Sequence, residues 1–141
     1  MMGLPTLIRL QRAGLDQKRR RLADLEARFD DLRSSLADLE AEVCEQQRIA
    51  AASEEVGFAY ADYAAAAIRR RHDLERAMAE LDIDIAAARA EVGEAFRELK
   101  KLEIVRERRE REALAEENRR EQIILDDLGL EMHRRRPSTS A

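Results

Sequence analysis

The side chains that most often carry chemistry are few in this sequence. Cys44 is the single cysteine, so neither an internal disulfide nor a cysteine-rich zinc site can form. The two histidines, His72 and His133, lack a cysteine or aspartate at metal-site spacing, and five glycines make no glycine-rich phosphate loop. Asp82 and Asp84 lie two residues apart, so on a helix they face different directions. The sequence therefore predicts no enzyme, no metal site and no cofactor.

Basic residues gather in three short runs that are candidates for binding an acidic partner. Nucleic-acid binding requires a continuous basic face and a positive net charge. The formal net charge is −4, and acidic residues interrupt each neighbourhood. The sequence favours solvated helix faces, with an acidic protein partner as the alternative and nucleic acid as the least favoured function. The runs are Lys18–Arg21, Arg69–Arg71 and Arg134–Arg136.

The sequence shows no sign of secretion or of membrane insertion. Residues 1–10 contain neither a continuous apolar run nor a signal cleavage site. No apolar segment approaches the roughly 20 residues that a membrane span requires. We therefore expect a cytoplasmic protein.

Apolar residues recur in alternating steps of three and four along most of the chain, as they do in coiled coils. So narrow an apolar stripe suits one or two partner helices rather than a thick globular core. We therefore predict an all-α rod. Polar Gln11 and Lys18 in the first run predict a weaker packing near its beginning. The first run contains Met1, Leu4, Ile8, Leu15, Leu22, Leu25, Phe29, Leu32, Leu36, Leu39 and Val43, and the second contains Leu74, Met78, Leu81, Ile85, Ala88, Val92, Ala95, Leu99 and Leu102.

A turn is expected between the two runs, where the heptad is weakest. Ser53 is followed by two glutamates, which is a helix-start signal. Gly57 would cost a helix interior about 1 kcal/mol relative to alanine. We place the turn at about residues 51–58, between one helix over about 5–52 and a second over about 58–135.

The ends of the two runs indicate that the helices are antiparallel. If the chain folds back near residue 55, Leu4 lies opposite about residue 106, and the second run loses its apolar character after Leu102 and Val105. We predict a single domain over residues 1–136, a long α-hairpin whose second helix overhangs by about 45 Å. Residues 137–141 are expected to be a disordered tail. The alternative is one uninterrupted helix that dimerises as a generic cytoplasmic scaffold.

Two groups of apolar residues are candidate partner-binding surfaces. Three aromatic residues near the turn, Phe58, Tyr60 and Tyr63, either pack the turn or form a docking patch, since aromatic residues are enriched at interfaces. The predicted overhang carries a second group with no helix of this chain to cover it, so a partner or self-association must bury it. That group contains Ile123, Ile124, Leu125, Leu128, Leu130 and Met132.

The overall layout and the C-terminal helix resemble the FliJ proteins of the bacterial flagellar type III export apparatus. Heptads that begin within the first ten residues are followed by a lysine-containing end of the second run, an Arg/Glu-rich helix and a closing Glu-Gln…Leu-Asp segment. The C-terminal segments that carry this resemblance are Lys100-Lys101-Leu102-Glu103, Arg106-Glu107-Arg108-Arg109-Glu110, Glu117-Asn118-Arg119-Arg120-Glu121-Gln122 and Leu125-Asp126-Asp127.

The resemblance implies a non-enzymatic coiled-coil stalk with three kinds of partner. Family members insert into the hexameric ring of the export ATPase and contact the cytoplasmic domain of the export gate and the export chaperones. Peripheral association with the membrane would follow from these contacts. An equivalent stalk of a virulence type III secretion system is the alternative. The implied ring contacts are Arg106, Arg109, Arg119 and Arg120, and the implied gate or chaperone contacts are Phe58, Tyr60, Tyr63, Ile123, Ile124, Leu125 and Leu128.

Overall fold

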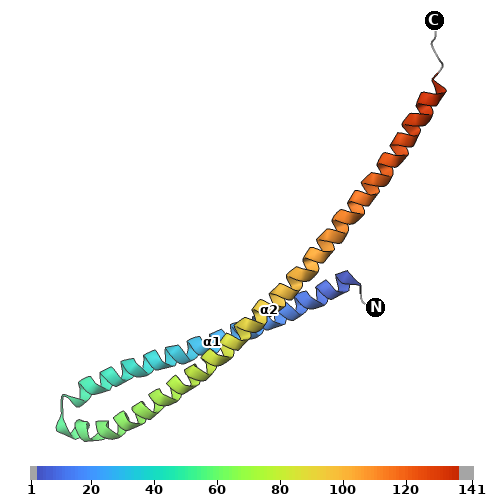
Figure 1. The fold of residues 1–141 in the computed structure, drawn as a ribbon. Coiled ribbons are helices and arrows are strands. Elements are labelled where there is room, and N and C mark those ends of the chain that lie inside the picture. The colour runs from blue at the N-terminus through green and yellow to red at the C-terminus, as the bar shows by residue number, and fades with distance from the viewer. Residues whose placement is uncertain (1–2, 137–141) are drawn as a thin grey trace.

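The computed structural model describes residues 3–136, and within that range the chain forms two long helices. Helix α1 spans Leu4–Ala50 and helix α2 spans Glu54–Arg135. The helices run antiparallel, and α2 continues far beyond the start of α1 as a single helix (Figure 1). The predicted all-α hairpin with an overhanging second helix is confirmed. The alternative of one uninterrupted helix is wrong, because α1 and α2 pack against each other.

The apolar heptad residues form the interface between the two helices. Within the described range, each apolar residue predicted for the two runs is buried or half-buried, whereas Lys18 is exposed and Met1 lies outside the range. Most of the buried core lies in two clusters, and Ala67 and Leu74 of α2 are buried outside them. One contains Ile8, Leu15, Ala95 and Leu99, with Leu4, Val92 and Leu102 packed around them, and the other contains Leu25, Ile85 and Ala88, with Leu22, Phe29 and Leu81.

The turn is shorter than the sequence predicted. Only residues 51–53 separate the helices, so α2 begins at Glu54 rather than near residue 58. Ser53 occupies the N-cap position with extended backbone angles (φ −155°, ψ 138°), although its side chain makes no capping hydrogen bond. Glu54 and Glu55 lie in the first turn of α2, where a helix N-terminus favours negative charge.

Gly57 does not belong to the turn. It lies inside α2, and its backbone N–H donates to the carbonyl of Ser53 at 3.1 Å. A penalty of about 1 kcal/mol for a helical glycine is small beside the start signals immediately before it. The tail expected at residues 137–141 lies outside the described residues.

Three ion pairs join the two helices along the hairpin and are consistent with a single antiparallel register. Arg12 and Glu103 approach to 3.2 Å, Glu26 and Arg89 to 3.3 Å, and Glu40 and Arg71 to 3.6 Å. From one pair to the next, the residue number in α1 increases while the residue number in α2 decreases, as an antiparallel arrangement requires. These ion pairs flank the apolar seam at the surface, where such pairs contribute little, so apolar packing dominates the stability.

Candidate partner-binding surfaces

The first candidate surface is the arm, which we define as residues 106–135 of α2. Leu4, the first residue of α1, packs against the cluster that includes Leu99, as does Leu102, so the N-terminus of α1 lies at the level where the arm begins. Arg106 and Glu116 are half-buried, and the other residues of the arm are exposed. The arm therefore extends into solvent as a single helix, as Figure 1 shows.

The four arginines predicted to bind a partner differ in their present contacts. Arg119 donates two hydrogen bonds to the carboxylate of Glu116, at 2.6 Å and 3.0 Å, and Arg120 donates one at 3.2 Å. The hydrogen bonds from Arg119, with that from Arg120, hold the pKa of Glu116 below its ordinary value despite some desolvation. Arg106 lies 3.9 Å from Glu110, and Arg109 makes no ion pair within the described part of the chain.

These arginines do not share one face of the helix. Arg106, Arg109 and Arg120 continue the three- and four-residue steps of the seam, so they lie on the side of α2 that faces α1 in the hairpin. Arg119 precedes Arg120 by one residue and is therefore rotated by about 100° from it. The arm presents a basic line along the continuation of the seam, with Arg119 beside that line.

The apolar residues of the arm are exposed, but they divide between two sides of the helix. Ile124 and Leu128 lie one turn apart and are 59% and 52% exposed, and Leu125 lies beside them. Ile123 points to a different side, where Leu130 follows seven residues later. The predicted patch is thus two narrow apolar strips rather than one continuous face.

The three aromatic residues near the turn are not brought together. Tyr60 and Tyr63 are half-buried, with ring centroids 6.1 Å apart, whereas Phe58 is 85% exposed. The Tyr63 hydroxyl is buried and has no hydrogen-bond partner within the described residues. Desolvation by burial, followed by the nearby Glu42 carboxylate, raises the pKa of Tyr63. The tyrosines therefore pack the turn, and Phe58 alone is free to act as an exposed anchor.

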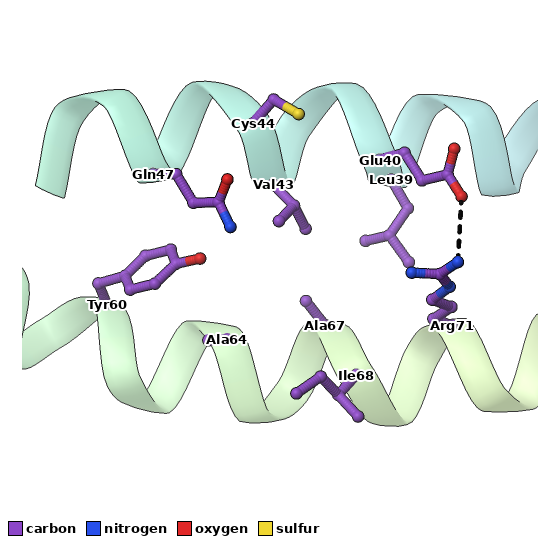
Figure 2. Close-up of a pocket in the computed structure, with 10 residues that line it drawn as sticks. All are labelled: Leu39, Glu40, Val43, Cys44, Gln47, Tyr60, Ala64, Ala67, Ile68 and Arg71. Carbon is purple, nitrogen blue, oxygen red and sulfur yellow. Dashed lines mark ion pairs between the residues drawn. The ribbon is translucent and has the colours of Figure 1, made fainter. Parts of the chain in front are cut away.

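A groove near the turn was not anticipated from the sequence. It has a volume of about 430 Å³ and lies between α1 and α2 where the helices separate (Figures 1 and 2). Leu39 and Val43 line it from α1, Ala64 and Ala67 line it from α2, and Tyr60 lies at the end nearest the turn (Figure 2). The signal in the sequence is the alanine run at residues 64–67, because small side chains leave space between two helices.

Within residues 3–136, no helix is long and apolar enough to cross a bilayer, and no three or more histidine, cysteine, aspartate or glutamate side chains are arranged to hold a metal ion. The fold is a long two-helix coiled coil with a bare C-terminal arm. The family model described as Flagellar FliJ protein matches residues 2–138, and the chain belongs to the FliJ family.

Membership of this family makes the chain a coiled-coil component of the flagellar protein export apparatus, and the family is non-catalytic. The comparisons with curated proteins and with solved structures found no match.

Proposed function

We propose that the chain acts as a stalk whose arm engages the hexameric ring of the export ATPase, while the hairpin links that ring to the export gate and the export chaperones. The observation that carries this proposal is the arm itself, a single charged helix that no other part of the described chain covers. In this arrangement the protein works in the cytoplasm and is held at the membrane peripherally by the apparatus.

The dimensions and charge of the arm suit a narrow ring lumen. A single helix is about 10–12 Å across with its side chains, and the 30 residues of the arm give about 45 Å of length. Surface ion pairs such as Arg119–Glu116 are weak, so their partners exchange at little cost. Such a helix can contact several ring subunits in turn without a deep fixed interface.

The apolar residues are proposed to bind the gate and the chaperones. Phe58 offers an exposed aromatic anchor beside the turn, at the opposite end of the molecule from the arm's C-terminus. Tyr60 and Tyr63 support this end from between the helices. On the arm, Ile124, Leu128 and Leu125 form a strip that an apolar groove on a chaperone would cover, and Ile123 forms part of the second strip.

Stimulation of ATP hydrolysis by the purified export ATPase tests the ring assignment. In the first variant, Arg106, Arg109, Arg119 and Arg120 are changed to glutamine, and we expect the stimulation to be lost while helicity by circular dichroism is kept. The matched control changes four exposed arginines of α1 to glutamine, and it should stimulate as the wild type does. Full stimulation by the arm variant removes the ring assignment. The control positions are Arg9, Arg19, Arg21 and Arg28.

A further inference from the structure

Helix α2 carries a second apolar face that α1 does not cover. Ile68 is 58% exposed and Ile83 is 72% exposed, although both lie within the part of α2 that pairs with α1. Ile68 is also among the residues that line the groove, but Figure 2 shows its side chain pointing away from Leu39 and Val43. Phe58, 85% exposed, belongs to the same face by its spacing. We call this the outer face of α2.

The outer face follows a coiled-coil spacing of its own. From Phe58 to Gly93 its apolar members recur mainly in steps of three and four, with His72 and the adjacent pair Glu75 and Arg76 in the middle. At 1.5 Å per residue this segment is about 50 Å long. Between the large residues the side chains are small, so a second helix can approach closely. The smaller members are Ala61, Ala65, Ala79, Ala86 and Ala90, all exposed, and the half-buried Gly93.

The residues of the outer face are placed symmetrically about the midpoint between residues 75 and 76. Each one before this midpoint has a counterpart at the same distance after it. A second copy in antiparallel orientation, related by a two-fold axis at that point, therefore places like residues opposite each other. Ile68 meets Ile83 of the second copy, and Phe58 meets Gly93, where the ring lies beside the Arg97 guanidinium, 3.5 Å from the place that a Cβ would take. Ala65 meets Ala86 in the same way. A two-fold interface requires this kind of self-complementarity.

We propose that the outer face of α2 binds the same face of a second copy of this chain, antiparallel, with the two-fold axis between residues 75 and 76. The charges beside the face support this register. In this register Arg69 lies opposite Asp82 of the second copy, and Arg71 lies opposite Glu80 of the second copy. Within the described residues Arg69, Glu80 and Asp82 form no ion pair, so they are available for these contacts.

The charges at the two-fold axis are balanced. Glu75 of each copy lies opposite Arg76 of the other, and Arg71 lies 3.0 Å from Glu75 within each copy. A helix face about 50 Å long and about 10 Å wide offers on the order of 500 Å² of projected area per chain, below the roughly 800 Å² per partner of a standard interface. The dimer is therefore concentration-dependent rather than permanent.

The proposed dimer has a consequence for the arm and for Phe58. Because the two α2 helices run in opposite directions, the two arms leave the dimer at opposite ends, and each Phe58 is covered by the other copy. A dimer therefore cannot place both arms in one ring, and it hides the exposed aromatic anchor. The dimer is thus a storage form, in which the residues proposed to bind the export partners are less accessible.

Sedimentation equilibrium of the full chain over a wide range of concentrations tests the proposal. We expect the wild type to approach the dimer mass, and Ile68→Glu combined with Ile83→Glu to remain a monomer with unchanged helicity. The control is Ile104→Glu, which changes an exposed isoleucine of α2 beyond the proposed dimer interface at residues 58–93. This variant should dimerise as the wild type does. A wild type that stays monomeric at the highest concentration overturns the proposal. A dimer that survives in the double variant but is lost in Ile124→Glu with Leu128→Glu also overturns it, because self-association then lies in the arm.

Disulfide cross-linking in a Cys44→Ser background tests the register. A mixture of Ile68→Cys chains and Ile83→Cys chains should cross-link much faster than either variant alone, because residue 68 lies opposite residue 83 of the second copy. The preparation of Ile68→Cys alone is the internal control. Preferential linkage of residue 68 to residue 68 indicates a parallel pair and contradicts the proposed two-fold axis.

Discussion

The guanidinium of Arg12 donates to the carboxylate of Glu103 at 3.2 Å, joining residues that are 91 positions apart in the sequence. Lys100 also lies 3.3 Å from the same carboxylate, whose side chain is only 18% exposed. This small cluster lies at the open end of the hairpin, one turn before the arm begins. It joins α1 to α2 at the place where the paired and unpaired parts of α2 meet.

Acid should weaken the contact between α1 and α2 at this end of the hairpin. Hydrogen bonding from Arg12, with a smaller contribution from Lys100, holds the pKa of Glu103 below its ordinary value of 4.5. The stabilisation is therefore complete above pH 4.5 and is lost as the pH falls through the lower folded-state pKa. Hydrogen exchange should show protection near Arg12 falling in this acidic range, and Glu103→Gln should remove that dependence. Glu98→Gln is the control because Glu98 pairs only with Lys101 of its own helix; the same loss of pH dependence in both variants would contradict the assignment to Glu103.

Truncating the centre of the seam should destabilise the hairpin strongly. Leu25 is 7% exposed and packs in a cluster with Ile85 and Ala88. Leu25→Ala removes this packing and leaves a cavity, so we expect a loss of about 2–5 kcal/mol in the free energy of unfolding. Urea denaturation followed by circular dichroism measures it. Leu10→Ala, at a position 54% exposed, should change the stability by less than about 0.5 kcal/mol. Equal effects at the two positions would be inconsistent with the seam.

Replacing Gly57 should stabilise the protein, because the structure places it inside α2 with ordinary helical backbone angles. A methyl group added there meets the carbonyl oxygen of Ala50 at 3.9 Å, which is normal contact. Gly57→Ala should therefore raise the stability by about 0.5–1 kcal/mol. Thermal unfolding measures the change, and a lower melting temperature would indicate that residue 57 belongs to the turn after all.

The weaker end of the hairpin is expected to be the turn rather than the open end. Ile8 and Leu15 are 2% and 3% exposed, so the polar positions Gln11 and Lys18 do not disrupt their packing. Toward the turn, Leu39 and Val43 are only half-buried beside the groove. Amide exchange should therefore be slower at residues 8–25 than at residues 39–50. Faster exchange at residues 8–25 than at residues 39–50 would instead support the weaker packing expected from Gln11 and Lys18.

The sequence predicted the fold well because a coiled coil depends on one repeating pattern. Ile8 and Leu99 are 91 residues apart, yet the period of each run and the loss of apolar character after Leu102 were enough to place them in one interface. Helix α2 begins at Glu54 rather than near residue 58, because Ser53 and the two glutamates after it set its start and Gly57 does not interrupt it.

The candidate surfaces were less predictable than the fold, because they depend on which side of a helix each residue takes. Phe58 and Tyr60 are near neighbours in the sequence, but one is exposed and the other lies between the helices. The groove arises from the separation of α1 and α2, which the alanine run at residues 64–67 indicates but the heptad spacing alone does not. Ile68 and Ile83 belong to a pattern that becomes visible only once the face covered by α1 is known.

The most direct test of the stalk assignment is photo-cross-linking in the assembled export apparatus. A benzophenone amino acid in place of Arg109 should cross-link to the export ATPase, because Arg109 lies on the arm along the continuation of the seam. The same amino acid in place of Arg21, on the outside of α1, should give no ATPase product. Cross-linking of position 21 to the ATPase, with none from position 109, would contradict the assignment of the arm to the ring.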